Sequence, residues 1–80
     1  MYFVYVLQSE SYPAQLYYGK THDLKERLKN HNSGQSPHTA KYKPWKIVWY
    51  GCFVLEEKAT AFEKYLKTAS GKAFLRKRLL

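Results

Sequence analysis

The sequence predicts an α+β fold, in which a small three-stranded antiparallel sheet is flanked by helices in the order β-β-α-β-α-α. Three apolar runs rich in aromatic residues are candidate strands: Met1–Leu7, Leu16–Gly19 and Trp45–Leu55. Apolar residues at helical spacing follow the second and the third run. A chain of 80 residues is expected to form one domain, residues 1–80, with a modest core and two packed layers.

The first two strands are predicted to form a hairpin. Gln8–Gln15 is a polar connection, so the two strands lie side by side and residues distant in sequence share a face. Side chains alternate along a strand. One face therefore collects Phe3, Tyr5, Leu7, Tyr17 and Gly19. In this register Tyr5 and Tyr17 project together.

The first helix is predicted over Leu24–Asn32. Asp23 begins a capping-box pattern, with Asp in place of the usual Ser or Thr, and Gly34 suits a helix stop. On a helical wheel Arg27 and His31 lie one turn apart and face inward with the apolar stripe. An inward arginine needs a partner or a functional role.

Gln35–Pro44 is predicted to be a loop with a basic tip. Tyr42 lies between Lys41 and Lys43, so the tip could hold a backbone phosphate while the ring stacks on a base. An ordinary exposed loop explains the same residues equally well.

The third strand, Trp45–Leu55, is continuously apolar, which predicts a strand that is covered on both faces and therefore central. Gly51 is expected to mark a bulge. Cys52 is interpreted as a packed small hydrophobe rather than a reactive thiol. As the only cysteine it leaves the chain without a disulfide, which fits a reducing, cytoplasmic location.

The remaining helices are predicted over Lys58–Thr68 and Lys72–Leu79, with a break at Ser70-Gly71. Glu63 is the single acid in this part of the chain, against seven basic residues. It is either a surface partner of Lys67, worth a few tenths of a kcal/mol, or a metal ligand directed at the sheet. The sequence pattern alone leaves both interpretations open.

The net charge is +8, from 14 lysines and arginines against 6 acids. Such an excess in a small domain indicates a polyanionic partner, most often nucleic acid, with a solubilising surface as the plainer alternative. No apolar stretch approaches the ~20 residues that span a bilayer, and Met1–Leu7 lacks the basic lead and long apolar core of a signal peptide. We therefore expect no membrane contact.

The inward polar residues form a set suited to phosphodiester hydrolysis: Tyr5, Tyr17, Lys20, Arg27, His31 and Glu63. That reaction needs a group that takes a proton from water, a cation that offsets the charge on the phosphorane, a metal, and a ligand for the metal. A single carboxylate predicts one loosely held Mg²⁺ whose shell is completed by water and substrate phosphate. The three histidines and one cysteine lack zinc-ligand spacing, and no P-loop, dinucleotide fingerprint or nucleophile elbow occurs.

These residues resemble the GIY-YIG nuclease superfamily, in particular its small stand-alone bacterial endonucleases, and are similar to the N-terminal domain of the excision-repair nuclease subunit. The two half-motifs stand here as Val4-Tyr5-Val6 and Tyr17-Tyr18-Gly19, with the family's ten-residue gap, Val for Gly and Tyr for Ile. The stretches Lys20–Asn32 and Phe62–Leu75 also follow the family pattern. The resemblance covers essentially the whole chain.

The resemblance implies a Mg²⁺- or Mn²⁺-dependent endonuclease that hydrolyses DNA with one metal, structure-specific in repair or recombination. Tyr17 matches the general base, and Tyr5 matches the tyrosine that positions water or phosphate. Lys20 and Arg27 match cations that assist the base and stabilise the transition state. A phenol is a poor base at neutral pH unless nearby cations favour its ionised form.

The resemblance further implies that His31 binds phosphate or relays a proton and that Glu63 binds the metal. Gly19 allows close approach of a backbone or phosphate, and Lys72 joins the nucleic-acid contacts. No asparagine follows Glu63, where some relatives place one that helps to hold the site. The alternative function is a catalytically weak or inactive nucleic-acid-binding module that works with a partner. RNA is a further candidate substrate, and targeting would fall to a protein partner, a homodimer or DNA shape.

Overall fold

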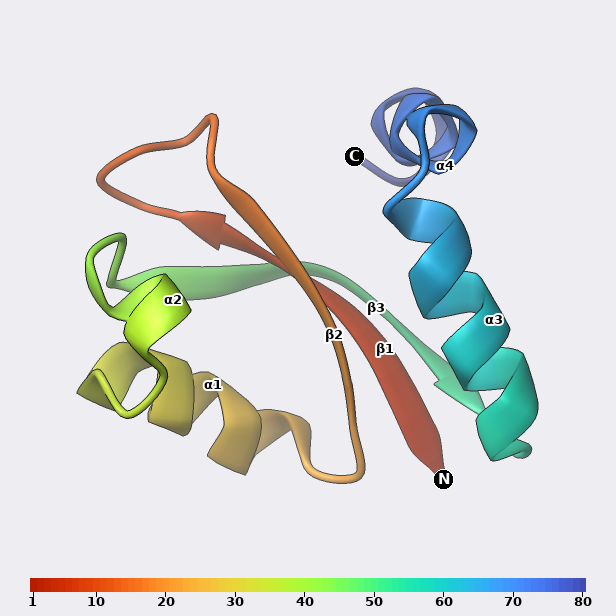
Figure 1. The fold of residues 1–80 in the computed structure, drawn as a ribbon, viewed down its shortest axis with the longest axis horizontal. Helices are drawn as coiled ribbons and strands as arrows, with labels where there is room; N and C mark the ends of the chain where they lie inside the picture. The colour runs from red at the N-terminus through yellow and green to blue at the C-terminus, as the bar shows by residue number, and fades with distance from the viewer.

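The computed structural model describes residues 1–80 as a sheet between two groups of helices (Figure 1). The strands are β1 (Tyr2–Ser9), β2 (Leu16–Thr21) and β3 (Trp45–Phe53), all antiparallel, in the spatial order β2-β1-β3. The helices are α1 (Leu24–Ser33), α2 (Pro37–Ala40), α3 (Glu56–Leu66), α4 (Ala69–Phe74) and a π-helical turn, η1 (Leu75–Leu79). The α+β class and element order are confirmed. The expected two layers become three, because helices cover both faces of the sheet.

The central strand is β1, so the prediction that the third strand is central was wrong. β3 is an edge strand that pairs with β1 alone. Its continuous apolar run arises from a bulge: Val6 pairs with Trp49 but Leu7 pairs with Ile47, which leaves Val48 as the extra residue. Because the bulge interrupts the alternation, Val48 and Trp49 both pack on the α3 side. The bulge therefore lies at Val48, not at the expected Gly51.

Two small cores lie on opposite faces of the sheet, because neighbouring residues of β1 point to opposite sides. The larger one is formed with α3 and η1 by buried Val4, Val6, Ala59, Leu66 and Leu75. The smaller one lies under α1 and is formed by buried Tyr5, Leu7 and Trp45, with Leu24 and Leu28 packed against them. Burial of these side chains is what fixes α1 and α3 on their faces.

The ends of α1 are set by the residues that the sequence indicated. Asp23 Oδ1 accepts a hydrogen bond from the amide of Glu26 at 3.1 Å. Gly34 ends the helix in the left-handed conformation at φ 84°, which a residue with a side chain rarely adopts. The helix therefore holds Arg27 and His31 at the expected one-turn spacing.

The C-terminal helices differ from the prediction at their boundaries. α3 begins at Glu56 rather than Lys58, and Gly71 lies inside α4 instead of breaking a helix. The break comes earlier, where Thr68 caps α4 by accepting a hydrogen bond from the amide of Gly71 at 3.0 Å. A Cβ at Gly71 would overlap the backbone carbonyl of Tyr65. The glycine is needed there for close packing of α4 against the end of α3.

Two further expectations are corrected. The predicted loop Gln35–Pro44 contains α2, which begins with Ser36 as N-cap and Pro37 as its first residue. Cys52 is exposed rather than packed. It shares the α1 face with Phe3, its partner in the register, but α1 packs against the other end of that face, over Tyr5 and Leu7. No helix has the length and apolar character needed to cross a bilayer.

Candidate active site

The candidate site is centred on Tyr5, which is 1% exposed on the central strand. Its ring lies across the neighbouring strand over Gly19, its partner in the register, so that a Cβ at position 19 would overlap the Tyr5 hydroxyl. Gly19 was expected to allow close approach of backbone or phosphate. In the structure that approach is made by the Tyr5 ring, and Gly19 itself is buried.

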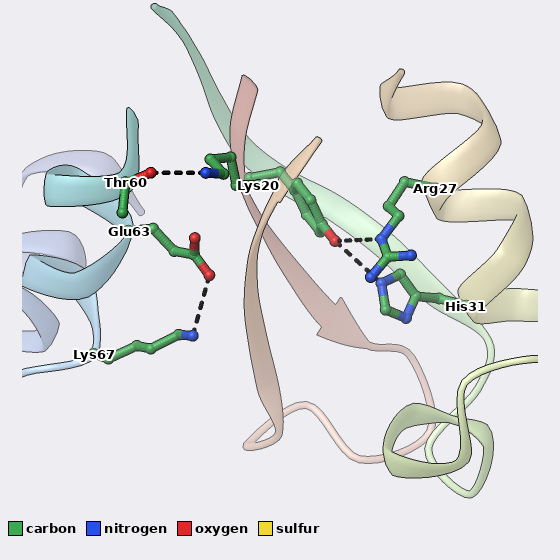
Figure 2. A network of polar contacts seen from close by, with 7 residues as sticks. Lys20, Arg27, His31, Thr60, Glu63 and Lys67 are labelled. Carbon is green, nitrogen blue, oxygen red and sulfur yellow. Dashed lines mark hydrogen bonds and ion pairs between the residues drawn. The ribbon is translucent and has the colours of Figure 1, made fainter. Parts of the chain in front are cut away.

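The Tyr5 hydroxyl contacts two side chains of α1 (Figure 2). Arg27 Nε donates to Tyr5 Oη at 3.3 Å, and His31 Nε2 lies 3.2 Å from the same oxygen. Burial raises the pKa of Tyr5, an effect that the Arg27 hydrogen bond and charge oppose and that the charges of Tyr17 and Glu63 reinforce. Tyr5 is therefore a neutral phenol at pH 7.

His31 is fully buried between β1 and α2. Its Nδ1 lies 2.8 Å from Thr39 Oγ1, so both ring nitrogens have a partner. Burial lowers the pKa of His31, and the positive charge of Arg27 lowers it further. The pKa of Arg27 is raised, chiefly by its hydrogen bond to Tyr5. The site thus pairs a neutral imidazole with a charged guanidinium.

Tyr17 shares this face, as the alternation of the strands predicted. It stands opposite Leu7 in the register, and its ring centroid lies 6.3 Å from that of Tyr5 and 4.7 Å from that of His31. The side chain is half-buried, whereas Tyr5 and His31 are fully enclosed. Of the two motif tyrosines, Tyr17 is thus the one open to solvent.

Lys20 is on the opposite side of the sheet. It pairs with Val4 in the register, and its Nζ lies 2.7 Å from Thr60 Oγ1 and 3.3 Å from Glu56 Oε2, both on α3. Glu63 is on the same helix, where its Oε2 accepts from Lys67 Nζ at 3.1 Å. Figure 2 shows this group and the Arg27–His31 group on either side of the strands. Four of the six predicted site residues are together, and two approach from the other face.

A divalent metal would find few protein ligands near this site. No group of three or more metal-ligating side chains occurs, so a cation would have one protein ligand, Glu63, as Mg²⁺ accepts when water and phosphate fill its shell. Glu63 Oε1 makes no hydrogen bond within the chain, and the side chain is 20% exposed. Lys67 is a competing cation at the same carboxylate.

Tyr42 is packed rather than free for stacking. Its half-buried ring lies 5.5 Å from that of Tyr12 and 6.3 Å from that of Trp45, both edge-on. Lys41 Nζ lies 5.1 Å from the Tyr42 ring centroid. These contacts favour the ordinary structural interpretation of Tyr42.

The other predicted nucleic-acid contacts are exposed lysines. Lys43 Nζ lies near Gly34, at the C-terminal end of α1, where unpaired carbonyls favour a cation. Lys72 is on α4, on the opposite side of the sheet from α1 (Figure 1). The structure does not bring these lysines into one cluster.

Thr39 and Asn32 are site residues that sequence reasoning missed. Asn32 accepts from the Trp45 amide at 2.5 Å and donates to its carbonyl at 3.1 Å, which fixes α1 to the start of β3. Thr39 contacts His31 from α2. The Ser36-Pro37 pair is a helix-start signal that could have revealed α2, and with it a reason to examine Thr39.

Comparison with known proteins agrees with this architecture. The family model described as the GIY-YIG catalytic domain matches residues 1–78. A relative from Bacillus pumilus named UPF0213 protein is 34% identical over 67 residues, which are 82% of this chain and 66% of the relative. The chain thus spans slightly less than two thirds of that relative's length. The family match, residues 1–78, includes the motif tyrosines, Gly19, Arg27 and Glu63, and the chain belongs to the GIY-YIG catalytic domain family.

Proposed function

We propose that this chain is a Mg²⁺- or Mn²⁺-dependent endonuclease that hydrolyses phosphodiester bonds of DNA with a single metal ion. The observation that carries the proposal is the Tyr5 hydroxyl held between Arg27 and His31 beside the more open Tyr17. A guanidinium and two phenols on one face supply the cation and the proton-transfer groups that phosphate hydrolysis requires.

Each residue has a distinct role in this proposal. Tyr17 takes the proton from the attacking water, because it is the motif tyrosine that solvent reaches. Arg27 stabilises the negative charge that develops on the phosphate. Tyr5 and His31 are 1% and 0% exposed, so both act through Arg27 rather than by touching the phosphate. The Tyr5 hydroxyl, hydrogen-bonded to Arg27 Nε and to His31 Nε2, orients the guanidinium.

The remaining two predicted residues act from the α3 side. Glu63 would hold the metal, which when bound supplies positive charge to the scissile phosphate. Lys20 Nζ would assist Tyr17 or the phosphate after release from Glu56 and Thr60. Exposed pairs such as Lys20–Glu56 contribute little free energy, so this release costs little.

The charge supports a nucleic-acid substrate. A net charge of +8 favours a polyanion, and DNA is proposed over RNA, with branched or damaged DNA in repair or recombination as the target. The cytoplasmic location and a protein partner or homodimer for targeting stay predictions.

A nucleic-acid-binding module with weak or no cleavage is the second candidate. It is favoured by the engagement of Glu63 with Lys67 and of Lys20 with Glu56 and Thr60, since neither side chain hydrogen-bonds to Tyr5. Cleavage measurements separate the two functions.

The test is cleavage of single-stranded, duplex, flap and four-way-junction DNA with Mg²⁺, Mn²⁺ or EDTA. Arg27→Ala and Glu63→Ala are expected to abolish metal-dependent cleavage and leave binding largely intact. Lys25→Ala and Glu57→Ala are matched controls, because they make the same charge changes at exposed positions of the same helices. Wild-type cleavage by both site variants would refute the mechanism, and binding without cleavage under every metal would favour the second candidate.

A further inference from the structure

Thr39 is a buried polar side chain that neither the motifs nor the proposed mechanism uses. It is 1% exposed, on the four-residue helix α2. Its position is fixed on the backbone side, where its amide donates to Ser36 O at 3.2 Å and its carbonyl accepts from Trp45 Nε1 at 2.9 Å. Its hydroxyl is thereby held 2.8 Å from His31 Nδ1.

The hydrogen atoms of this chain of contacts can be assigned by counting donors and acceptors. Arg27 Nε can only donate, so the Tyr5 oxygen accepts from it and its own hydrogen must go elsewhere. The available acceptor for that hydrogen is His31 Nε2, which lies 3.2 Å from Tyr5 Oη. Nε2 must then carry a lone pair, and the hydrogen of the neutral imidazole is on Nδ1.

The Thr39 hydroxyl completes the same assignment. It accepts the Nδ1 hydrogen of His31 and donates its own hydrogen to Ser36 O at 3.3 Å. Each hydrogen between Arg27 Nε and Ser36 O then has an acceptor.

The opposite tautomer leaves a donor without a partner. With the hydrogen on Nε2, His31 would donate to Tyr5 Oη, which already accepts from Arg27. The Tyr5 hydrogen would then have no acceptor within the chain at a 1% exposed side chain, and a buried unsatisfied donor is costly. The same count disfavours the doubly protonated imidazolium in the resting site.

We propose that Thr39 is a positioning residue that stabilises His31 as the Nδ1–H tautomer, with the Nε2 lone pair directed at the Tyr5 hydroxyl. The Tyr5 hydrogen then goes to Nε2, which leaves the Tyr5 oxygen to accept from Arg27 Nε and so orients the guanidinium. The use of this arrangement in catalysis rests on the proposed nuclease function, whereas the tautomer does not.

The tautomer is measured directly by two-bond ¹H–¹⁵N correlation spectra of the uniformly ¹⁵N-labelled full chain at pH 7.5. His31 is expected to show a protonated Nδ1 and an unprotonated Nε2. The exposed His22 and His38 serve as references in the same spectrum. A protonated Nε2 on wild-type His31 would overturn the proposal, whatever any variant shows.

Thr39→Val removes the hydroxyl at nearly constant volume and leaves the Nδ1 hydrogen of His31 without its acceptor, so the share of the Nε2–H form is expected to rise above that of the wild type. Thr39→Ser keeps the hydroxyl and is expected to retain the wild-type tautomer. Thr39→Ala gives the same test as the valine variant if valine disturbs α2. A wild-type tautomer in a folded variant that lacks the hydroxyl refutes the positioning role.

Cleavage provides the separate catalytic arm. Misplacing a group that stabilises the transition state can cost about 10²-fold, so Thr39→Val is expected to lower the cleavage rate at least ~10-fold and Thr39→Ser to keep the wild-type rate. Unchanged cleavage alongside a shifted tautomer would refute the catalytic use of this arrangement but not the tautomer assignment. The expected tautomers in the wild type and in the Thr39 variants of a protein that cuts no DNA would support the positioning role and count against the nuclease alone.

Discussion

The Tyr5 hydroxyl lies over the backbone of Gly19, in the space that a Cβ at position 19 would fill. Gly34 is the only glycine with positive φ, so the requirement at Gly19 is room rather than backbone conformation. The last residue of the second half-motif is thus explained by the central residue of the first. The two half-motifs therefore depend on each other across the β1–β2 pair, because the Tyr5 ring needs the space that Gly19 leaves.

Gly19→Ala should therefore displace the Tyr5 ring and break its contacts with Arg27 and His31. We expect a loss of about 1–3 kcal/mol in the free energy of unfolding, together with loss of cleavage. Gly51→Ala is the matched control on the other edge strand, because its Cβ would meet the tip of the Trp49 side chain, Cη2, at 2.8 Å, and that half-buried ring can move. Gly51→Ala should therefore lose less free energy of unfolding than Gly19→Ala. Urea unfolding of both variants measures the two losses, and equal values would contradict this expectation.

Gly71→Ala should be more destabilising than either. The added Cβ would overlap the carbonyl of Tyr65, which is backbone and cannot rotate away. We expect a loss above about 3 kcal/mol, because α4 must separate from α3. Thermal unfolding followed by circular dichroism measures it, and a stability close to that of the wild type would refute the packing of these helices.

His31 makes stability depend on pH. Its pKa is lowered in the folded state, so between the folded pKa and the unfolded value of about 6.5 the unfolded chain binds more protons. Stability is therefore complete above about pH 6.5 and falls as the pH drops through this window. The difference in unfolding free energy between wild type and His31→Gln should therefore decrease as the pH falls through this window. Its slope with pH should correspond to the binding of at most one proton. Parallel pH profiles from urea titrations would exclude it.

Lys67 should weaken metal binding at Glu63. Its Nζ occupies one carboxylate oxygen at 3.1 Å, but the lysine is 53% exposed, so the pair is worth only about 0.3–0.5 kcal/mol. Lys67→Met is expected to raise Mn²⁺ affinity about two-fold more than Lys64→Met, which removes the same charge at an exposed position of α3 that has no ion pair. Electron paramagnetic resonance titration measures both, and equal affinities would show that the ion pair does not compete.

DNA binding should weaken steeply with salt, because neutralised phosphates release counterions. The logarithm of the association constant is expected to fall linearly with the logarithm of salt concentration. Each phosphate-contacting lysine that is removed should reduce the slope by about one. Fluorescence anisotropy with Lys41→Ala, Lys43→Ala and Lys72→Ala will identify which lysines contribute. A flat salt dependence of the wild type would exclude the basic surface as the binding site.

The hairpin, the first helix and their shared face could be predicted because local chemistry decides them. Asp23 and Gly34 set the ends of α1 through short-range hydrogen bonds and backbone conformation. Strand alternation alone put Tyr5 and Tyr17 on one face. The same alternation, applied to Lys20, would have placed it on the opposite face from Gly19, where the structure has it.

The errors come from tertiary packing that local patterns do not encode. The bulge at Val48 directs two consecutive apolar side chains to one side, which imitates a strand buried on both faces. Cys52 is exposed because α1 packs against only part of its face. The contact between Thr39 and His31 depends on the path of α2, which hydrophobic periodicity cannot reveal in four residues.

The central position of β1 has a consequence for synthesis on the ribosome. The first strand to emerge is the one that both others need, so its pairing with β2 can form early, while its second edge waits for residues 45–53. Until then the nascent chain presents an unpaired apolar strand, a surface prone to wrong pairing. Loop closure between β1 and β3 is thus the step most exposed to aggregation during biogenesis.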